Sequence, residues 1–192
     1  THMEFLPFHF LLTTIGNAGW LKYQDTSTGR LVAQIPTKQG APTAFGQNPH
    51  NAILHVGHQN GTVSMWSPND QKPLVKVLAH RGPVRSLACD REGRYMVSTG
   101  QDSKMSVWDV RMFKEVNNYF LRSPGSSVAI SDTNLTAVGW GTQTTVWRDL
   151  FKKNAADQQK VQSPYMAWGG EGDRIERVRW CPYEDILGIS HN

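Results

Sequence analysis

The chain has 192 residues, 39% of them hydrophobic and 19% charged, with 17 glycines, 10 prolines and 7 tryptophans. That composition is typical of a turn-rich globular β protein, and it excludes a disordered chain or one built on long helices. The net charge of +4 suits an RNA-rich environment but is weak evidence for direct contact with nucleic acid. The cysteines, Cys89 and Cys181, lie far apart without a CxxC motif, so reduced thiols are expected rather than a disulfide scaffold or a zinc site.

The N-terminal end contains the most apolar run of the chain, from Phe5 to Leu12, which Pro7 and His9 interrupt. The run is too short to span a membrane, and no positively charged segment precedes it as in a secretory signal. Residues 1–3 look like a cloning scar, and the predicted domain begins at Glu4.

Four stretches share one order of features: a glycine, a polar turn, a short strand of alternating apolar residues and an aromatic residue. They begin at Gly16, Gly57, Gly100 and Gly139. A spacing of about 40 residues is the period of a WD-type propeller, in which each blade has four strands. The sequence therefore predicts one partial propeller over residues 4–192. Its repeats are 4–40, 41–81, 82–124, 125–173 and an incomplete 174–192.

The third repeat shows the strand pattern most clearly. Short runs bounded by turn residues predict strands over 84–89, 95–99, 105–109 and 115–119. The predicted fold class is all-β, with about four and a half blades of a seven-bladed propeller that would need roughly 290 residues. The first and last blades should then have open edges, which other chain segments or partners would cover.

The same repeat carries four side chains at the spacing of the structural tetrad of WD-repeat proteins. They are His80, Ser98, Asp102 and Trp108. The resemblance implies that the histidine bonds to both the aspartate and the serine, and that the indole N–H bonds to the serine. Leaving one buried member unpaired would cost roughly 1–3 kcal/mol. The catalytic alternative lacks a nucleophile or second acid paired with the histidine, so we interpret the tetrad as structural.

The other repeats depart from this motif. At the corresponding positions the chain has Gln24 in the first repeat, Val56, Asn60 and Trp66 in the second, and Ala137, Gly141 and Trp147 in the fourth. We interpret these differences as ordinary repeat divergence, since apolar packing can replace polar bonds. A specialised function is the alternative.

Two segments outside the tetrad have more than one interpretation. His55 and His58 lie on a strand-to-turn segment, where surface or internally bonded histidines are expected rather than a metal site. Residues 149–161 predict a solvated loop or, alternatively, a short partner-binding helix. No metal or cofactor is predicted.

The fifth repeat interleaves arginines with apolar residues. Arg174, Arg177 and Arg179 alternate with Ile175, Val178 and Trp180. The pattern predicts a half-buried strand with a solvated face. The alternative is an arginine–aromatic patch for single-stranded RNA, which combines stacking with positive charge.

A propeller displays its inter-blade loops and the turns between second and third strands on one face. On that face we place the candidate partner-binding residues His58, Gln59, Asn60, Arg81, Lys104 and Arg174. Its basic side chains would suit acidic protein tails or RNA phosphates, and a solvated rim is the alternative.

Longer stretches resemble one particular family. They include "EFLPFHFLL" from Glu4, "QNPHNAILHVGHQNGTVSMWSP" from Gln47, the segment from His80 to Arg111, and "CPYEDILGISH" from Cys181. They are similar to nucleolar WD-repeat subunits of the small-subunit processome, within the U3 small nucleolar RNA-associated proteins.

That resemblance implies a non-catalytic scaffold in the nucleolus that supports early cleavage and folding of precursor ribosomal RNA and maturation of 18S rRNA. Its partners would be other processome proteins and the U3 ribonucleoprotein, with direct contact to pre-rRNA or snoRNA left open. The alternative is a WD-repeat adapter elsewhere, such as a ubiquitin-ligase receptor or a signalling scaffold. A propeller enzyme would need convergent carboxylates or a metal-ligand set, and the sequence shows neither.

Overall fold

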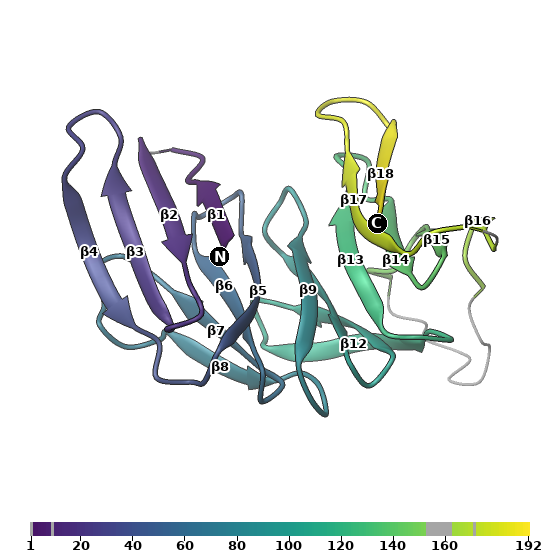
Figure 1. The fold of residues 1–192 in the computed structure, drawn as a ribbon, viewed down its shortest axis with the longest axis horizontal. Coiled ribbons are helices and arrows are strands. Elements are labelled where there is room, and N and C mark those ends of the chain that lie inside the picture. Colours follow the sequence, from purple (N-terminus) through teal and green to yellow (C-terminus); the bar gives the residue numbers. More distant parts are fainter. Residues whose placement is uncertain (1, 9, 153–162, 171) are drawn as a thin grey trace.

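The chain folds into a row of antiparallel sheets, four of them with four strands and the last with two (Figure 1). The computed structural model describes residues 2–8, 10–152, 163–170 and 172–192. The strands of the first two sheets are β1 (His2–Phe5), β2 (Leu11–Ile15), β3 (Trp20–Asp25), β4 (Leu31–Pro36), β5 (Pro42–Gln47), β6 (Leu54–His58), β7 (Thr62–Trp66) and β8 (Val75–Leu78). Those of the other three sheets are β9 (Val84–Cys89), β10 (Tyr95–Gly100), β11 (Lys104–Asp109), β12 (Lys114–Phe120), β13 (Gly125–Ile130), β14 (Thr136–Trp140), β15 (Gln143–Trp147), β16 (Met166–Gly169), β17 (Ile175–Trp180) and β18 (Leu187–His191).

The predicted all-β class is confirmed, and so are the strands predicted in the third repeat. Three of the observed strands, β10, β11 and β12, are one or two residues longer than predicted. Among the described residues, no helix has the length and apolar character needed to cross a membrane.

The first strand, β1, begins at His2, before the predicted start of the domain at Glu4. His2 pairs with Ile15 and Met3 with Thr14, so both belong to β1. The sequence offered no sign of this pairing because β1 has only four residues and its partner β2 lies across a loop. The predicted insertion at 149–161 falls mostly outside the described residues.

The sheets form an open arc rather than a closed ring (Figure 1). The innermost strands stand side by side, with β1 against β5, β5 against β9, β9 against β13, and β13 against β17. The N-terminal sheet and the β17–β18 hairpin lie at the two ends of this arc. This is the predicted partial propeller of about four and a half blades.

Apolar cores lie between successive sheets, not within one central core. Leu54 and Trp66 of the second sheet pack with Leu21 of the first. The same sheet contributes Val63 to a cluster with Val84 of the third. Further clusters join the third sheet to the fourth and the fourth to the fifth. Because each sheet packs chiefly on its neighbours, the arrangement is that of a repeat protein whose stability sums over adjacent interfaces.

The middle strands of the second sheet are buried because neighbouring sheets cover both of their faces. All five residues of β6 are buried, and in β7 only the first residue is partly exposed. Glycines allow this close approach. A Cβ added at Gly57 would lie 2.7 Å from a methyl carbon of Val84, and one at Gly139 would lie 2.7 Å from a methyl carbon of Ile175.

One hydrogen bond recurs from repeat to repeat. The carbonyls of Gly19, Gly61 and Ser103, in the turns between second and third strands, accept from the amides of Thr37, Ala79 and Leu121 respectively. Successive donors are about 42 residues apart, and so are successive acceptors, close to the predicted period. Each bond ties such a turn to the segment leading to the next sheet, so these turns and connections lie together.

Candidate functional site

A chain of hydrogen bonds joins His80, Ser98, Asp102 and Trp108 in the third sheet. His80 lies between β8 and β9, and its Nδ1 is 3.1 Å from Asp102 Oδ1. Its Nε2 is 2.8 Å from the Ser98 hydroxyl on β10. The Trp108 indole on β11 donates to the same hydroxyl at 3.1 Å. The structure thus brings together the four side chains that the sequence singled out.

The protonation states of His80 and Asp102 fix the direction of these hydrogen bonds. Burial lowers the pKa of His80, and the opposing effect of Asp102 does not cancel it. Burial raises the pKa of Asp102, but hydrogen bonds from the Arg81 N–H and from His80 outweigh it, so the net pKa lies below the usual value. A neutral imidazole then donates from Nδ1 to the carboxylate and accepts the Ser98 proton at Nε2. The polar side-chain atoms of these four residues all have hydrogen-bond partners within the fold.

The second sheet has a hydrogen-bonded triad that the sequence analysis missed. His58 Nε2 lies 2.6 Å from the hydroxyl of Ser64, and the Trp66 indole donates to that hydroxyl at 2.7 Å. Ser64 is on the third strand of the sheet, two residues before the tryptophan. The tetrad pattern instead has its serine on the second strand, where this repeat has Val56. The signal that could have found Ser64 is the pattern Ser-x-Trp on β7.

The fourth sheet uses the same pattern with threonine. The Trp147 indole donates to the hydroxyl of Thr145 at 3.1 Å, and the Trp140 indole reaches the same oxygen at 3.3 Å. Polar anchoring of the tryptophan is therefore kept in three sheets, although only the third has the full set of four residues. In the first sheet, Gln24 occupies the corresponding site and is exposed.

His58 is not available to partners, which corrects its place among the candidate binding residues. It is fully buried, and burial lowers its pKa to about 4. His55 is also fully buried with a pKa of about 4, and its Nδ1 lies 3.1 Å from the Met96 sulfur and 3.4 Å from the Cys89 sulfur. Across the described residues, no group of three or more His, Cys, Asp or Glu side chains could hold a metal ion.

The remaining candidate binding residues divide by exposure. Gln59, Asn60, Arg81 and Arg174 are exposed. Lys104 is half-buried, and its ammonium lies 2.6 Å from a carboxylate oxygen of Glu115, so much of its charge is neutralised. The sequence could not reveal this pair because Glu115 is on β12, where its register partner is Trp108 and not Lys104.

Arg81 and the turn between β10 and β11 are adjacent. The Arg81 amide donates to Asp102 Oδ2 at 3.0 Å, and the Gln101 amide donates to the Pro83 carbonyl at 2.9 Å. Arg174 lies in a different place, before β17, where the Ile175 amide bonds to the Gly141 carbonyl at 2.8 Å. The exposed candidates thus spread along one rim instead of forming a single cluster.

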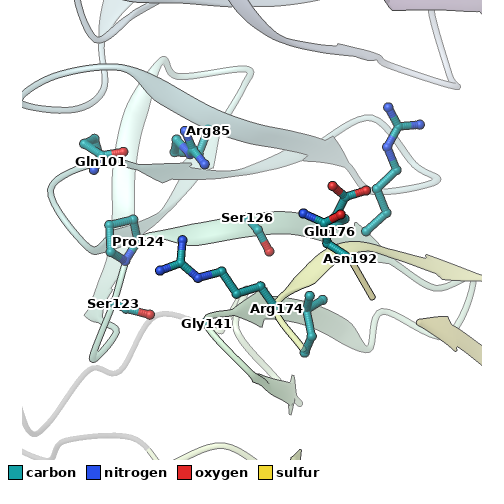
Figure 2. A pocket seen from close by; sticks show the side chains of 11 residues that line it. Arg85, Gln101, Ser123, Pro124, Ser126, Gly141, Arg174, Glu176 and Asn192 are labelled. Atoms are coloured by element: carbon teal, nitrogen blue, oxygen red, sulfur yellow. The ribbon is translucent and has the colours of Figure 1, made fainter. Parts of the chain in front are cut away.

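A pocket of about 660 Å³ connects these two parts of the rim (Figure 2). Its lining includes Gln101 and Arg174, and also Arg85 and Arg177, which the prediction of binding residues did not include. Both arginines occupy polar positions beside buried ones on β9 and β17, and this pattern could have predicted that they face away from the core.

The alternative of an arginine–aromatic patch on the fifth repeat does not fit the geometry. Trp180 is partly buried and packs in the core between the fourth and fifth sheets, where its indole donates to the Ala129 carbonyl at 3.2 Å. Arg177 and Arg179 are exposed on the same strand. The aromatic ring and the arginines therefore point to different surroundings.

Comparisons with known proteins agree with this geometry. The model of the WD domain, G-beta repeat, matches residues 71–109, the segment that holds the hydrogen-bonded chain of the third sheet. A chain in the crystal structure of the mitotic checkpoint complex superposes with a TM-score of 0.83 at 17% identity, over 98% of this chain and 56% of that one. The chain is part of a WD-repeat propeller.

This propeller segment is also similar to curated proteins over nearly all of its length. It is 46% identical to U3 small nucleolar RNA-associated protein 7 of Saccharomyces cerevisiae, over 99% of this chain and 36% of that protein. It is 38% identical to WD repeat-containing protein 46 of Homo sapiens, over 100% of this chain and 31% of that protein. The similarity confirms the predicted resemblance. The chain spans about a third of the length of these relatives.

A second family model, the BING4CT (NUC141) domain, matches residues 164–192. That match begins just before β16 and includes the β17–β18 hairpin. It covers Arg174 and Arg177 of the pocket.

Proposed function

We propose that this propeller segment belongs to a non-catalytic scaffold of the small-subunit processome. The scaffold would act in the nucleolus with the U3 ribonucleoprotein, and it would support early cleavage and folding of precursor ribosomal RNA and hence maturation of 18S rRNA. The observation that carries the proposal is the 46% identity with U3 small nucleolar RNA-associated protein 7 over 99% of this chain.

The side-chain chemistry supports a scaffold rather than an enzyme. The most prominent polar constellation, around His80, uses each of its donors and acceptors within the fold. The buried histidines of the second sheet have pKa values of about 4 and stay neutral at physiological pH. Groups held in this way stabilise the sheets and are not positioned for proton transfer to a substrate.

Partners would dock on the rim formed by the turns between second and third strands and the inter-sheet connections. Its exposed polar residues are Gln59, Asn60, Arg81 and Arg174. A rigid stack of sheets holds this rim in place, and loops on such a scaffold commonly carry recognition. Partners or further blades would also cover the open edges of the first and last sheets.

The test is sedimentation of the full-length protein that contains this segment. A tagged copy should co-sediment with pre-ribosomal particles and co-purify U3 RNA, and its depletion should lower 18S rRNA without a matching loss of 25S or 28S rRNA. Sedimentation with a ubiquitin ligase or a signalling complex instead, with normal 18S levels on depletion, would favour the adapter alternative.

A further inference from the structure

The pocket of about 660 Å³ lies where β9, β13 and β17, the innermost strands of three successive sheets, approach one another. In Figure 2, Arg174 extends into the middle of the pocket, with Arg85 and Gln101 on one side and Glu176 and Asn192 on the other. Its volume is within the range of about 300–1,000 Å³ of pockets that bind ligands. Three sheets build the pocket, so its shape is set by the rigid packing between them.

The arginines that line this pocket are not neutralised by a carboxylate among the described residues, unlike some arginines elsewhere. Elsewhere, Arg91 pairs with Asp132 at 2.9 Å, and Arg111 pairs with Asp109 at 2.8 Å. Within the described residues, Arg85, Arg174 and Arg177 make no such ion pair. The lining has one carboxylate, Glu176, against these three guanidinium groups, so the pocket keeps a positive charge.

Neutral hydrogen-bonding groups stand beside the arginines. Gln101 and Asn192 offer amide groups that can donate and accept. The Ser123 hydroxyl is buried and has no hydrogen-bond partner among the described residues.

The lining favours a peptide over RNA. Proteins hold single-stranded RNA largely by stacking bases on aromatic side chains, and none of the described residues that line this pocket is aromatic. Double-stranded RNA is a wide cylinder that a concave pocket between sheets cannot enclose. An extended peptide has a narrow backbone for the amide and hydroxyl groups, and its carboxylates can form bidentate bonds with arginine.

We propose that this pocket binds an extended protein segment rich in aspartate and glutamate, with its carboxylates on Arg85, Arg174 and Arg177. The inference extends the proposed docking rim inward to the three innermost strands. It names a ligand chemistry that neither the WD-repeat fold nor the similarity to other proteins supplies.

The test measures binding of fluorescein-labelled decaglutamate to the full-length protein by fluorescence anisotropy, at about 0.15 M salt so that weak surface attraction is screened. The triple variant Arg85→Gln, Arg174→Gln and Arg177→Gln should weaken binding by about tenfold or more, because it removes three charge-assisted bonds. Labelled decauridylate, tested in parallel, should bind more weakly than decaglutamate to the unaltered protein.

The matched control is the triple variant Arg91→Gln, Arg94→Gln and Arg111→Gln. It removes the same formal charge from arginines that already have carboxylate partners. Its affinity for decaglutamate should stay within about twofold of the unaltered protein, since these arginines do not line the pocket and their charge is screened at this salt concentration. Circular dichroism would confirm that both variants fold.

Three results would overturn the inference: no binding of decaglutamate to the unaltered protein, equal losses in the two triple variants, or preferential binding of decauridylate that the pocket variant abolishes. The last result would reassign the pocket to RNA phosphates. The assay needs no pre-ribosomal particle. A protein that binds decaglutamate but never enters such particles would therefore overturn the proposed function and leave this inference standing.

Discussion

Trp66 donates its indole N–H to the hydroxyl of Ser64, two residues earlier on the same strand, at 2.7 Å. In the third sheet the Trp108 indole instead bonds to Ser98 on the adjacent strand, at 3.1 Å. Both arrangements satisfy a buried indole with a serine that also contacts a histidine. A repeat can therefore lose the serine of its second strand and keep the same polar anchoring from its third strand.

Replacing Ser64 should reveal this anchoring. Ser64→Ala leaves the Trp66 indole and the His58 imidazole without their shared partner, so we expect a loss of about 1–3 kcal/mol in the free energy of unfolding. The control is Ser106→Ala on β11, where the hydroxyl is also buried but has no hydrogen-bond partner. That change should be neutral or slightly stabilising. Chemical denaturation measures both, and equal losses would show that the triad contributes nothing specific.

The four-residue chain of the third sheet leads to a second prediction. His80→Ala should lower the free energy of unfolding by about 1–3 kcal/mol, because Ser98 and Asp102 lose a buried partner. Gln24→Ala, at the corresponding tryptophan site of the first sheet, should cost less than about 0.5 kcal/mol since Gln24 is exposed. If thermal unfolding shows the same loss for both variants, the structural role assigned to the tetrad is wrong.

Close contact between sheets should make one glycine irreplaceable. A Cβ at Gly139 would lie 2.7 Å from Ile175, so Gly139→Ala should push the fourth and fifth sheets apart and cost about 1–3 kcal/mol. Gly16, the glycine that begins the corresponding stretch of the first repeat, lies just after β2 and has nothing within 4 Å of an added Cβ. Gly16→Ala should therefore be nearly neutral in denaturant titrations, and a cost like that of Gly139→Ala would contradict the packing argument.

Stability should fall as the pH is lowered, in a window to which His55 and His58 both contribute. The pKa of His55 is about 4 in the folded chain, below the unperturbed value of 6.5, because burial disfavours the charged imidazole. The unfolded chain therefore takes up a proton first, and the stabilisation present above pH 6.5 is lost as the pH falls toward 4, by on the order of 3 kcal/mol. His55→Gln should flatten this part of the stability curve. An unchanged slope between pH 6.5 and 4 would show that the histidine titrates normally.

The docking rim can be tested in the full-length protein. The double variant Arg81→Glu and Arg174→Glu should reduce incorporation into pre-ribosomal particles without unfolding, because both residues are exposed. Lys104 is left unchanged, since its partner Glu115 already neutralises it. The control reverses two exposed charges elsewhere, Arg30→Glu and Lys114→Glu. Normal sedimentation of the rim variant would place binding on another surface.

The sequence was sufficient to predict the architecture because the residues that mark each repeat lie close together along the chain. Glycines, turn residues and tryptophans recur at about 40 residues, and each sheet packs mainly on its neighbours, so the period translates directly into blades. The four members of the tetrad were predictable for the same reason: their spacing within one repeat follows from the lengths of its strands and turns.

Tertiary structure alone decided what each polar residue does. The sequence around His58 is that of a surface turn, yet the side chain is fully buried, and its Nε2 bonds to the Ser64 hydroxyl instead of solvent. Lys104 carries a charge in the sequence that Glu115, from another strand, neutralises. Arg85 and Arg174 are about 90 residues apart, too far for a local pattern to relate them, and they line one pocket because three innermost strands converge. Local periodicity fixes which strands form, whereas the pairing of side chains from different sheets depends on distances that exist only after the sheets have packed.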